Sequence, residues 1–228
     1  MYQFEDDSLM LQNDLYQINM AESYWNDGIH ERMAVFDLYF RSMPFNGGYA
    51  VFNGLKRVID FMDNFGFSET DIEYLRSIGY QDDFLDYLKN LKFTGHIHSM
   101  QEGEICFGNE PLMRVEAPLI QAQLLETVLL NIINFHTLIA TKASRIRQIA
   151  NDDILMEFGT RRGQELDAAL WGARAAYIGG FNSTSNVRAG KLFGIPVSGT
   201  HAHALVQTYG DEYIAFKKYA ERHKDCVF

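Results

Sequence analysis

Three short polar runs hold the residues of this sequence that are best suited to chemistry. They are Gly159-Thr160-Arg161-Arg162, Asn182-Ser183-Thr184-Ser185-Asn186 and Gly199-Thr200-His201-Ala202-His203. Guanidinium groups bind carboxylates and phosphates through paired hydrogen bonds, and hydroxyl groups donate to the same anions. A neutral imidazole is a nucleophile or a base near pH 7. Together the three runs indicate a site for a small anion.

Each polar run follows a short apolar segment that we predict to be a β-strand, and these segments are 154–158, 176–181 and 195–198. A fourth apolar segment, 226–228, would be the next strand, and each interval is long enough for a helix. Alternating short strands and helices are typical of βα units on a parallel sheet. Loops at the carboxyl ends of such strands converge on one face, where helix N-termini favour an anion.

The same residues also have plain structural interpretations. The run 183–186 could be a turn with a helix cap, the pair 179–180 could ease the packing of a strand on a helix, and the arginines 161–162 could simply be solvated. His201 and His203 could form a zinc pair, but no cysteine or carboxylate nearby completes a ligand set. We therefore predict no metal site formed by protein side chains.

The residues before these runs predict an α+β domain. Asn13 or Asp14 would cap a helix, and the run 33–41 alternates as a strand does. Further helices are predicted at 54–65, 69–77 and 81–91, and short strands with turns over 95–117. Ser68 followed by Asp71 forms a variant of the capping box at the start of the second of these helices.

The longest apolar stretch, 119–140, is interrupted by polar side chains, which argues against a bilayer span. An apolar stripe with helical spacing runs along it: Leu125, Val128, Leu129, Ile132 and Ile133. We therefore predict a long buried helix over 118–150. It would connect the N-terminal domain, 1–117, to the βα units of 151–228.

The predicted fold class is thus α/β, with an α+β N-terminal domain followed by the first βα units of a βα barrel. A barrel that stopped at the apolar strand 226–228 would be unfinished. We therefore expect the chain to be a truncated portion of a longer protein.

Composition limits the class of partner. The chain has 228 residues, of which 47% are hydrophobic, and a formal net charge of −10. A globally acidic chain has no basic field for nucleic acid or an anionic membrane, so we expect neither as a partner. The acidic N-terminus lacks the features of a signal peptide, and the two cysteines, Cys106 and Cys226, have no metal or redox spacing. We expect a cytoplasmic protein without disulfides.

Four segments of the sequence resemble nicotinate phosphoribosyltransferases. They are NDLYQINMA (13–21), FDLYFRSMPFNGGYAVFNGL (36–55), EFGTRRGQ (157–164) and GGFNSTSNVRAGKLFGIPVSGTHAHAL (179–205). The resemblance covers essentially the whole chain in order, although members of the family continue beyond its last residue. It implies transfer of the phosphoribosyl group of phosphoribosyl pyrophosphate to nicotinate, giving nicotinate mononucleotide for NAD synthesis. It also implies coupled ATP hydrolysis, Mg²⁺ brought with the phosphates, and a homodimer whose subunits share the site.

The resemblance assigns the pyridine ring of nicotinate to four residues. Phe158 and Tyr16 match the aromatic pair that sandwiches the ring, with Tyr16 reaching across from the partner subunit. Flat side chains suit this position because they stack on both faces of the ring. Thr200 matches a residue that contacts nicotinate, and Asp14 would orient the segment of Tyr16.

The resemblance assigns the phosphate chemistry to the first and third polar runs. His203 matches the histidine that the family phosphorylates, and His201 is a secondary candidate. A loop with many N–H donors suits transient phosphorylation of an imidazole. Arg161 matches the arginine that forks onto a carboxylate or phosphate, and Arg162 would serve the anionic co-substrate.

Ser185 distinguishes this sequence from a sister family. Nicotinamide phosphoribosyltransferases resemble the same loops but carry an aspartate at the position of Ser185. A serine hydroxyl donates to a carboxylate, whereas an aspartate repels one, so Ser185 favours nicotinate. Quinolinate, with two carboxylates, would demand more basic groups than these loops hold. A nicotinamide or quinolinate enzyme, or an inactive chain that only binds anions or partner subunits, is the alternative.

Overall fold

The computed structural model describes residues 8–223, so the strand predicted at 226–228 lies outside the described residues. The chain divides into two compact units, Met1–Leu138 and Ile139–Phe228. The boundary falls inside helix α5 (Leu119–Ala150). The predicted division into 1–117, 118–150 and 151–228 stays a prediction.

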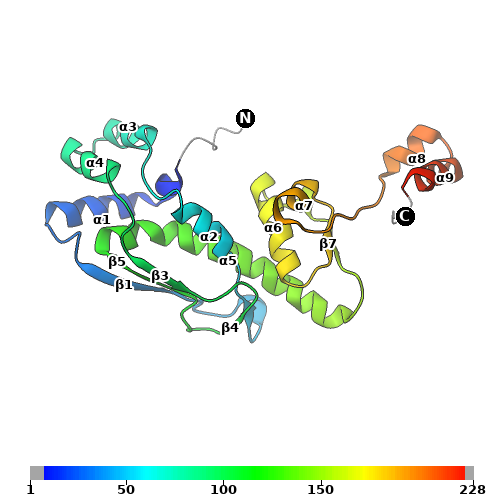
Figure 1. Cartoon of the computed structure of the whole chain (residues 1–228), viewed down its shortest axis with the longest axis horizontal. Helices are drawn as coiled ribbons and strands as arrows, with labels where there is room; N and C mark the ends of the chain where they lie inside the picture. Colours follow the sequence, from blue (N-terminus) through cyan, green and yellow to red (C-terminus); the bar gives the residue numbers. More distant parts are fainter. Residues whose placement is uncertain (1–7, 224–228) are drawn as a thin grey trace. The chain divides into compact units, whose positions relative to one another are not determined.

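The first unit contains a three-stranded antiparallel sheet. Its order is β1 (Met33–Leu38), β5 (Met113–Pro118) and β3 (His96–Ser99), and a second small sheet pairs β2 (Ala50–Val51) with β4 (Ile105–Cys106). Side chains alternate between the two faces, so that Val115 and Ala117 are buried while Asp37 and Arg114 form an ion pair at 2.8 Å on the other face. Figure 1 shows α5 alongside this sheet.

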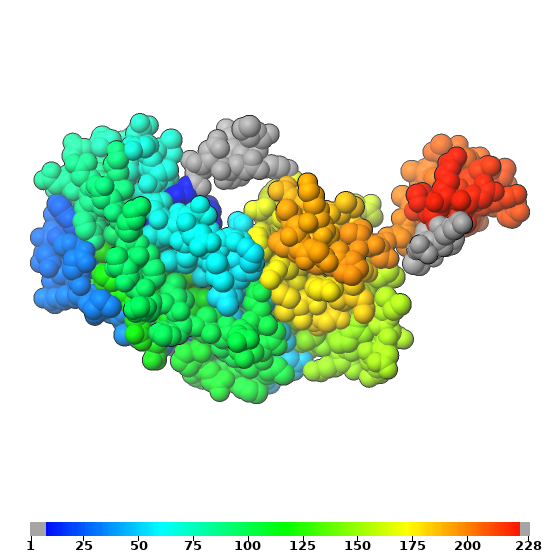
Figure 2. All heavy atoms as spheres, viewed as in Figure 1, coloured from blue at the N-terminus to red at the C-terminus, as the bar shows by residue number. Residues whose placement is uncertain are grey.

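Helices complete the first unit. They are α1 (Leu15–Asn26), α2 (Leu55–Met62), α3 (Glu69–Ser77) and α4 (Asp82–Lys89), with short 3₁₀ turns η1 (Leu9–Leu11) and η2 (Pro44–Asn46). The predicted capping box is confirmed, because the Asp71 N–H donates to Ser68 Oγ at 3.1 Å and the Ser68 N–H donates to Asp71 Oδ2 at 2.8 Å. Far apart in sequence, α1 and α4 lie side by side (Figure 2), and the rings of Trp25 and Phe84 are 5.8 Å apart.

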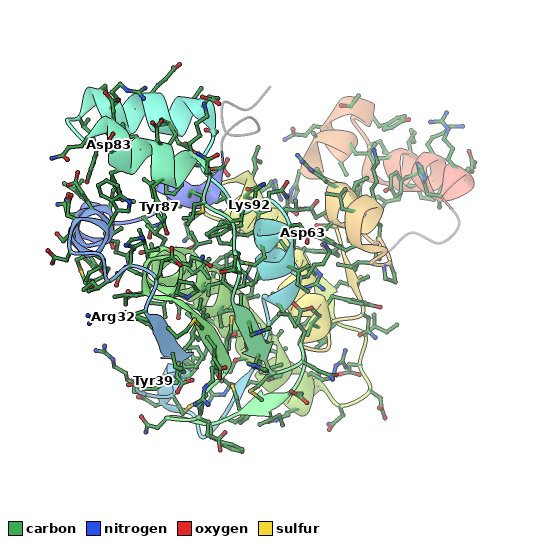
Figure 3. All side chains as sticks on the ribbon, turned by 60° about the vertical axis from the view of Figure 1, so that its left-hand side comes forward. Arg32, Tyr39, Asp63, Asp83, Tyr87 and Lys92 are labelled. Carbon is green, nitrogen blue, oxygen red and sulfur yellow. The ribbon has the colours of Figure 1, made fainter. Side chains whose placement is uncertain are left out.

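Tyr87 adds a second link between α4 and the segment that follows α1. Its hydroxyl donates to Glu31 Oε1 at 2.8 Å. Its ring packs against the His30 ring in a T-shaped arrangement, with the ring centroids 5.1 Å apart. Burial raises the pKa of Tyr87, and the carboxylate of Glu31 raises it further. Figure 3 labels Tyr87 at this end of the first unit.

Helix α5 confirms the prediction of a long buried helix. It has 32 residues, and the predicted apolar stripe is buried in the core of the first unit: Leu125, Val128, Leu129, Ile132 and Ile133. By length and composition alone this helix could cross a membrane, with a mean hydropathy of 1.4 over its most apolar window. However, 56% of that window is buried inside the structure, which is the pattern of a core helix.

The second unit has parallel strands, as the alternation of strand and helix predicts. Strand β6 (Met156–Glu157) pairs in parallel with β7 (Ser183–Thr184), and Thr184 forms a parallel bridge to Val197. The other elements of this unit are η3 (Thr160–Arg162), α6 (Leu166–Ile178), α7 (Val187–Phe193), α8 (His203–Tyr209) and α9 (Glu212–Arg222).

The strand predicted at 176–181 is wrong. Residues up to Ile178 belong to α6, whose run of alanines has high helix propensity, and the true strand β7 begins at Ser183. Gly179 ends the helix, and Gly180 has φ +107°, a conformation that favours glycine. The two glycines therefore end a helix rather than a strand. The strands predicted at 154–158 and 195–198 are shorter in the structure than predicted. The first is β6, at 156–157, and the second is a single bridge at Val197.

Gly179 is required by close packing against α5. A Cβ at this position would lie inside van der Waals contact of the Ala140 carbonyl oxygen and 2.6 Å from the Ala143 Cβ. The backbone conformation of Gly179 itself, with φ −71°, suits any residue. The glycine is therefore selected by space alone.

We expect Gly179→Ala to destabilise the second unit by about 1–3 kcal/mol, the usual cost of overpacking a close contact. Gly48→Ala is the matched control, because nothing lies within 4 Å of a Cβ built there. This control should change stability by less than about 0.5 kcal/mol. Urea unfolding followed by circular dichroism measures both changes, and equal midpoints for the two variants would contradict the tight contact.

Candidate functional site

The carboxyl ends of β6 and β7 bring the first two polar runs together. Glu157 and Thr184 are register partners in the parallel pair, so Phe158 and Ser185 leave adjacent strands at the same edge. The Ser185 N–H also donates to the Glu157 carbonyl at 2.9 Å. The prediction that these loops converge is thus met for the first two runs, although the second run contains the strand itself.

A network of polar side chains fixes this edge of the sheet. One carboxylate oxygen of Glu157 accepts from the Gly159 N–H, and the other accepts from Thr184 Oγ1 at 2.6 Å. Thr184 Oγ1 in turn accepts from the Asn186 N–H at 3.0 Å, and Asn186 Oδ1 caps α7 through the Ala189 N–H at 3.0 Å. Glu157 was missed in the sequence, because an acid at the end of a strand shows no periodic signal.

Arg147 holds β7 against the end of α5. Its Nε donates to the Gly180 carbonyl at 2.8 Å, and its Nη1 donates to the carbonyls of Asn151 at 2.8 Å and Asp153 at 2.7 Å. A further guanidinium N–H reaches the Asn182 side chain directly before the strand. One arginine thus satisfies four backbone and side-chain acceptors, and sequence patterns gave no signal for it.

Phe158, Arg161 and Arg162 lie on the loop that follows β6. Phe158 is 46% exposed, and the two arginines lie in the exposed turn η3. The Arg162 N–H donates to the Gly159 carbonyl at 2.7 Å, which closes this turn. Within residues 8–223 neither guanidinium forms an ion pair. Both can therefore bind an anion from solution.

The third polar run separates its two histidines. The ring of His201 packs on α9, with the Phe216 ring at 4.8 Å and the Tyr219 ring at 6.0 Å. His203 is exposed and begins α8, whereas Thr200 donates to the His201 carbonyl at 3.3 Å. In the described part of the chain neither Thr200 nor His203 hydrogen-bonds to the first two runs.

Tyr16 lies in the first unit, on the first turn of α1, and is 51% exposed. Together with Asp14 it lines a hollow of about 630 Å³ between α1, the segment 38–44 and α5. Tyr39, labelled in Figure 3, also lines this hollow. Asp14 is the N-cap residue of α1, but its side chain makes no capping hydrogen bond. The pairing of Tyr16 with Phe158 across a dimer stays a prediction.

The electrostatic environment of Tyr16 is acidic. The negative charge of Glu126 raises the pKa of Tyr16, and desolvation and Asp14 add to this effect. Gln17 holds Glu126 in place, because its Nε2 donates to Glu126 Oε2 at 2.9 Å while its Oε1 accepts from Thr127 Oγ1 at 2.6 Å. Gln17 is fully buried, so the carboxylate position is fixed from inside the unit.

The described residues contain no group of three or more histidine, cysteine or acidic side chains that could hold a metal ion. Cys106 is a free, buried cysteine, and burial raises the pKa of its thiol. Cys226 lies outside the described residues.

Residues 11–134 match the profile of the nicotinate phosphoribosyltransferase (NAPRTase) N-terminal domain. The chain belongs to this family. It is 65% identical over all of its 228 residues to the nicotinate phosphoribosyltransferase of Bacillus subtilis (strain 168) and covers 46% of that protein. It is 46% identical over 203 residues to nicotinate phosphoribosyltransferase 2 of Arabidopsis thaliana, covering 87% of this chain and 36% of the relative. The chain thus spans less than half the length of these relatives.

Solved structures agree with this assignment. The human nicotinic acid phosphoribosyltransferase superposes with a TM-score of 0.81 and 39% identity over 86% of this chain and 40% of the human chain. The nicotinate-nucleotide pyrophosphorylase of Pyrococcus furiosus gives a TM-score of 0.79 over 97% of this chain and 50% of that one, at 24% identity. At this identity the second likeness shows the fold alone. Both units therefore belong to a mixed α/β fold of this family.

We expect Glu126→Gln to lower the pKa of Tyr16 towards its ordinary value, because the variant removes the charge that opposes ionisation of the phenol. The amide of glutamine can still accept a hydrogen bond from Gln17. NMR titration of ¹³C-labelled tyrosine measures the change. The control is Glu22→Gln, which should lower the pKa of Tyr80 and leave Tyr16 as it is. An unchanged Tyr16 pKa in Glu126→Gln would show that the two groups do not interact.

Proposed function

We propose that the complete protein containing this chain is a nicotinate phosphoribosyltransferase. It would join nicotinate to the phosphoribosyl group of phosphoribosyl pyrophosphate, giving nicotinate mononucleotide for NAD synthesis, with coupled ATP hydrolysis. One observation carries the proposal: Phe158 and Ser185 leave paired parallel strands at the same edge, in a chain with 65% identity to a nicotinate phosphoribosyltransferase. An aromatic face and a hydroxyl donor side by side suit an aromatic carboxylate.

The nicotinate site would be shared by two subunits. Phe158 stacks on one face of the pyridine ring, and Tyr16 of a second subunit stacks on the other. Ser185, Thr200 and Arg161 supply the donors that bind the carboxylate, and a guanidinium gives two parallel hydrogen bonds. The exposure of Phe158 and Tyr16 supports this role, because a stacking residue must be accessible before the ligand arrives.

The anionic co-substrates would be bound by the remaining groups. Arg162 projects from the same turn as Arg161 and suits the phosphates of phosphoribosyl pyrophosphate. His203 is exposed, whereas His201 packs against α9, so His203 is the better candidate for phosphorylation by ATP. Mg²⁺ would neutralise the negative charge of the phosphates of phosphoribosyl pyrophosphate and ATP.

The assembly proposed here is a cytoplasmic homodimer with the remainder of a βα barrel completing each subunit. Exposed apolar side chains near Tyr16 support the pairing of two subunits. Leu15 is 62% exposed, and Tyr39 and Leu130, which line the hollow, are each 44% exposed. Apolar patches of this kind mark protein interfaces. The parallel order β6, β7 and Val197 supports the barrel.

Base selectivity tests the proposal. We expect Ser185→Asp to lower kcat/KM for nicotinate by a hundredfold or more, on the order of the several kcal/mol that an uncompensated like-charge contact costs. Nicotinamide should lose less, because its NH₂ group would gain an acceptor. The measurement is the ratio of kcat/KM for the two bases above pH 6, where both carboxylates are ionised.

Ser185→Asn is the matched control, since asparagine has the shape of aspartate without its charge. It should retain most of the activity with nicotinate that the aspartate variant loses. If the ratio does not move towards nicotinamide in Ser185→Asp, Ser185 has only a structural role before the α7 cap.

Phosphorylation is tested separately. We expect His203→Ala to abolish the acid-labile phosphate that labelled ATP leaves on the protein and to uncouple ATP hydrolysis from nucleotide formation. Slower transfer without ATP should persist, because the attacking nitrogen belongs to the pyridine and not to the histidine. His201→Gln is the control and should still be labelled. Normal labelling of His203→Ala would move the role to another residue.

A further inference from the structure

The carboxylate of Glu157 occupies an unusual place at the end of β6. It is half-buried, and among the described residues its hydrogen-bond partners are two uncharged groups, the Gly159 N–H and the Thr184 hydroxyl. No cation pairs with it in this part of the chain. A carboxylate removed partly from water is retained only where its hydrogen bonds compensate the lost hydration. The carboxylate of Glu157 therefore serves to hold the two groups that it contacts.

Hydrogen bonds that begin at Glu157 fix the residues on both sides of Ser185. Thr184, which donates to the carboxylate, precedes Ser185, and the same hydroxyl accepts from the N–H of Asn186, which follows it. The main-chain carbonyl of Glu157 accepts from the Ser185 N–H itself at 2.9 Å. The backbone around Ser185 is thus set by one residue of the neighbouring strand.

The other carboxylate oxygen sets the path of the chain after Phe158. It accepts from the Gly159 N–H, so the backbone folds back over Glu157 immediately after the ring. A Cβ on Gly159 would lie 2.6 Å from this oxygen, although the φ of −83° there suits any residue. Gly159 therefore leaves room for the carboxylate rather than meeting a backbone requirement.

We propose that Glu157 is a positioning residue for the pyridine site, which holds Phe158 and Ser185 at a fixed separation through Gly159 and Thr184. This inference rests on the proposed function, since it concerns the same site. In this role Glu157 does not touch the substrate, and its carboxylate supplies no proton. Its effect is to keep the stacking face and the hydroxyl donor in register before the ligand binds.

Glutamine cannot replace this carboxylate. Two oxygens accept from two donors, whereas an amide has one acceptor and turns its NH₂ towards the other donor. If that donor is Thr184, its Oγ1 can accept from the NH₂ group as well as from Asn186, but its hydroxyl proton then loses the carboxylate as its acceptor. Glu157→Gln therefore keeps the volume and disrupts one of the two links.

The kinetic test compares three substrates in the complete protein. We expect Glu157→Gln to raise KM for nicotinate by about tenfold or more, in line with the loss from misplacing a bound group by about 1 Å. KM for ATP should stay within about twofold, because His203 lies on the third polar run, and KM for phosphoribosyl pyrophosphate should rise less than KM for nicotinate, since Arg162 follows Gly159 on the same turn. Asp153→Asn is the matched control, since it removes a negative charge four residues earlier on an exposed side chain. It should leave all three KM values unchanged.

Further variants test whether Glu157 acts through Thr184 and Gly159. Thr184→Val and Gly159→Ala should each reproduce the selective rise in nicotinate KM, and Thr184→Ser, which keeps the hydroxyl, should recover most of the loss. The double variant Glu157→Gln/Thr184→Val should be no worse than the poorer single variant, because both changes act on the same link between Glu157 and Thr184. A fully additive double variant, or an equal rise in all three KM values, would overturn the proposal.

Hydrogen exchange without substrate separates this inference from the proposed function. We expect at least one of the amides of Gly159 and Asn186 to exchange about tenfold faster or more in Glu157→Gln, as when an acceptor worth about 1.4 kcal/mol is lost, with α6 unchanged. Unchanged exchange at both amides would overturn the positioning role whatever the activity. A wild-type protein that makes no nicotinate mononucleotide would instead contradict the proposed function, and no variant is needed to see that.

Discussion

The packing of α5 is the constraint on which both units depend. In the first unit its apolar stripe closes the core, with Leu125 and Ile133 fully buried. In the second unit the same helix presents Ala140 and Ala143, both buried, to the tight contact with Gly179. The helix has 32 residues, and it contributes large apolar side chains to the first unit and small ones to the second. The position of β7 follows from this contact.

The sequence was most informative where the signal is local and periodic. Helical spacing predicted α5, and the capping box at Ser68 predicted the start of α3, because both depend on residues within one or two turns. The strand at 176–181 was wrong for the converse reason. A strand of two residues, β7, has no period of its own, and the alanine-rich run before it favours a helix. Parallel pairing across 27 residues decides its place.

The candidate site was predicted in part. Hydroxyl, guanidinium and imidazole groups after the apolar runs indicated an anion site, and the structure places Phe158 and Ser185 directly after adjacent strands. The groups that hold them there were missed. Glu157 bonds to Thr184 27 residues away, and Arg147 bonds to Gly180 33 residues away, so neither has a neighbour in sequence that marks it. Residue types thus predicted the chemistry, whereas its geometry comes from long-range hydrogen bonds.

A crystal structure of the complete protein with nicotinate tests most directly whether nicotinate binds at the carboxyl ends of β6 and β7. We expect the pyridine ring to stack on Phe158, with its carboxylate within hydrogen-bond distance of Ser185 or Arg161. A ring bound elsewhere, with Phe158 and Ser185 both free of contact, would contradict the proposed site.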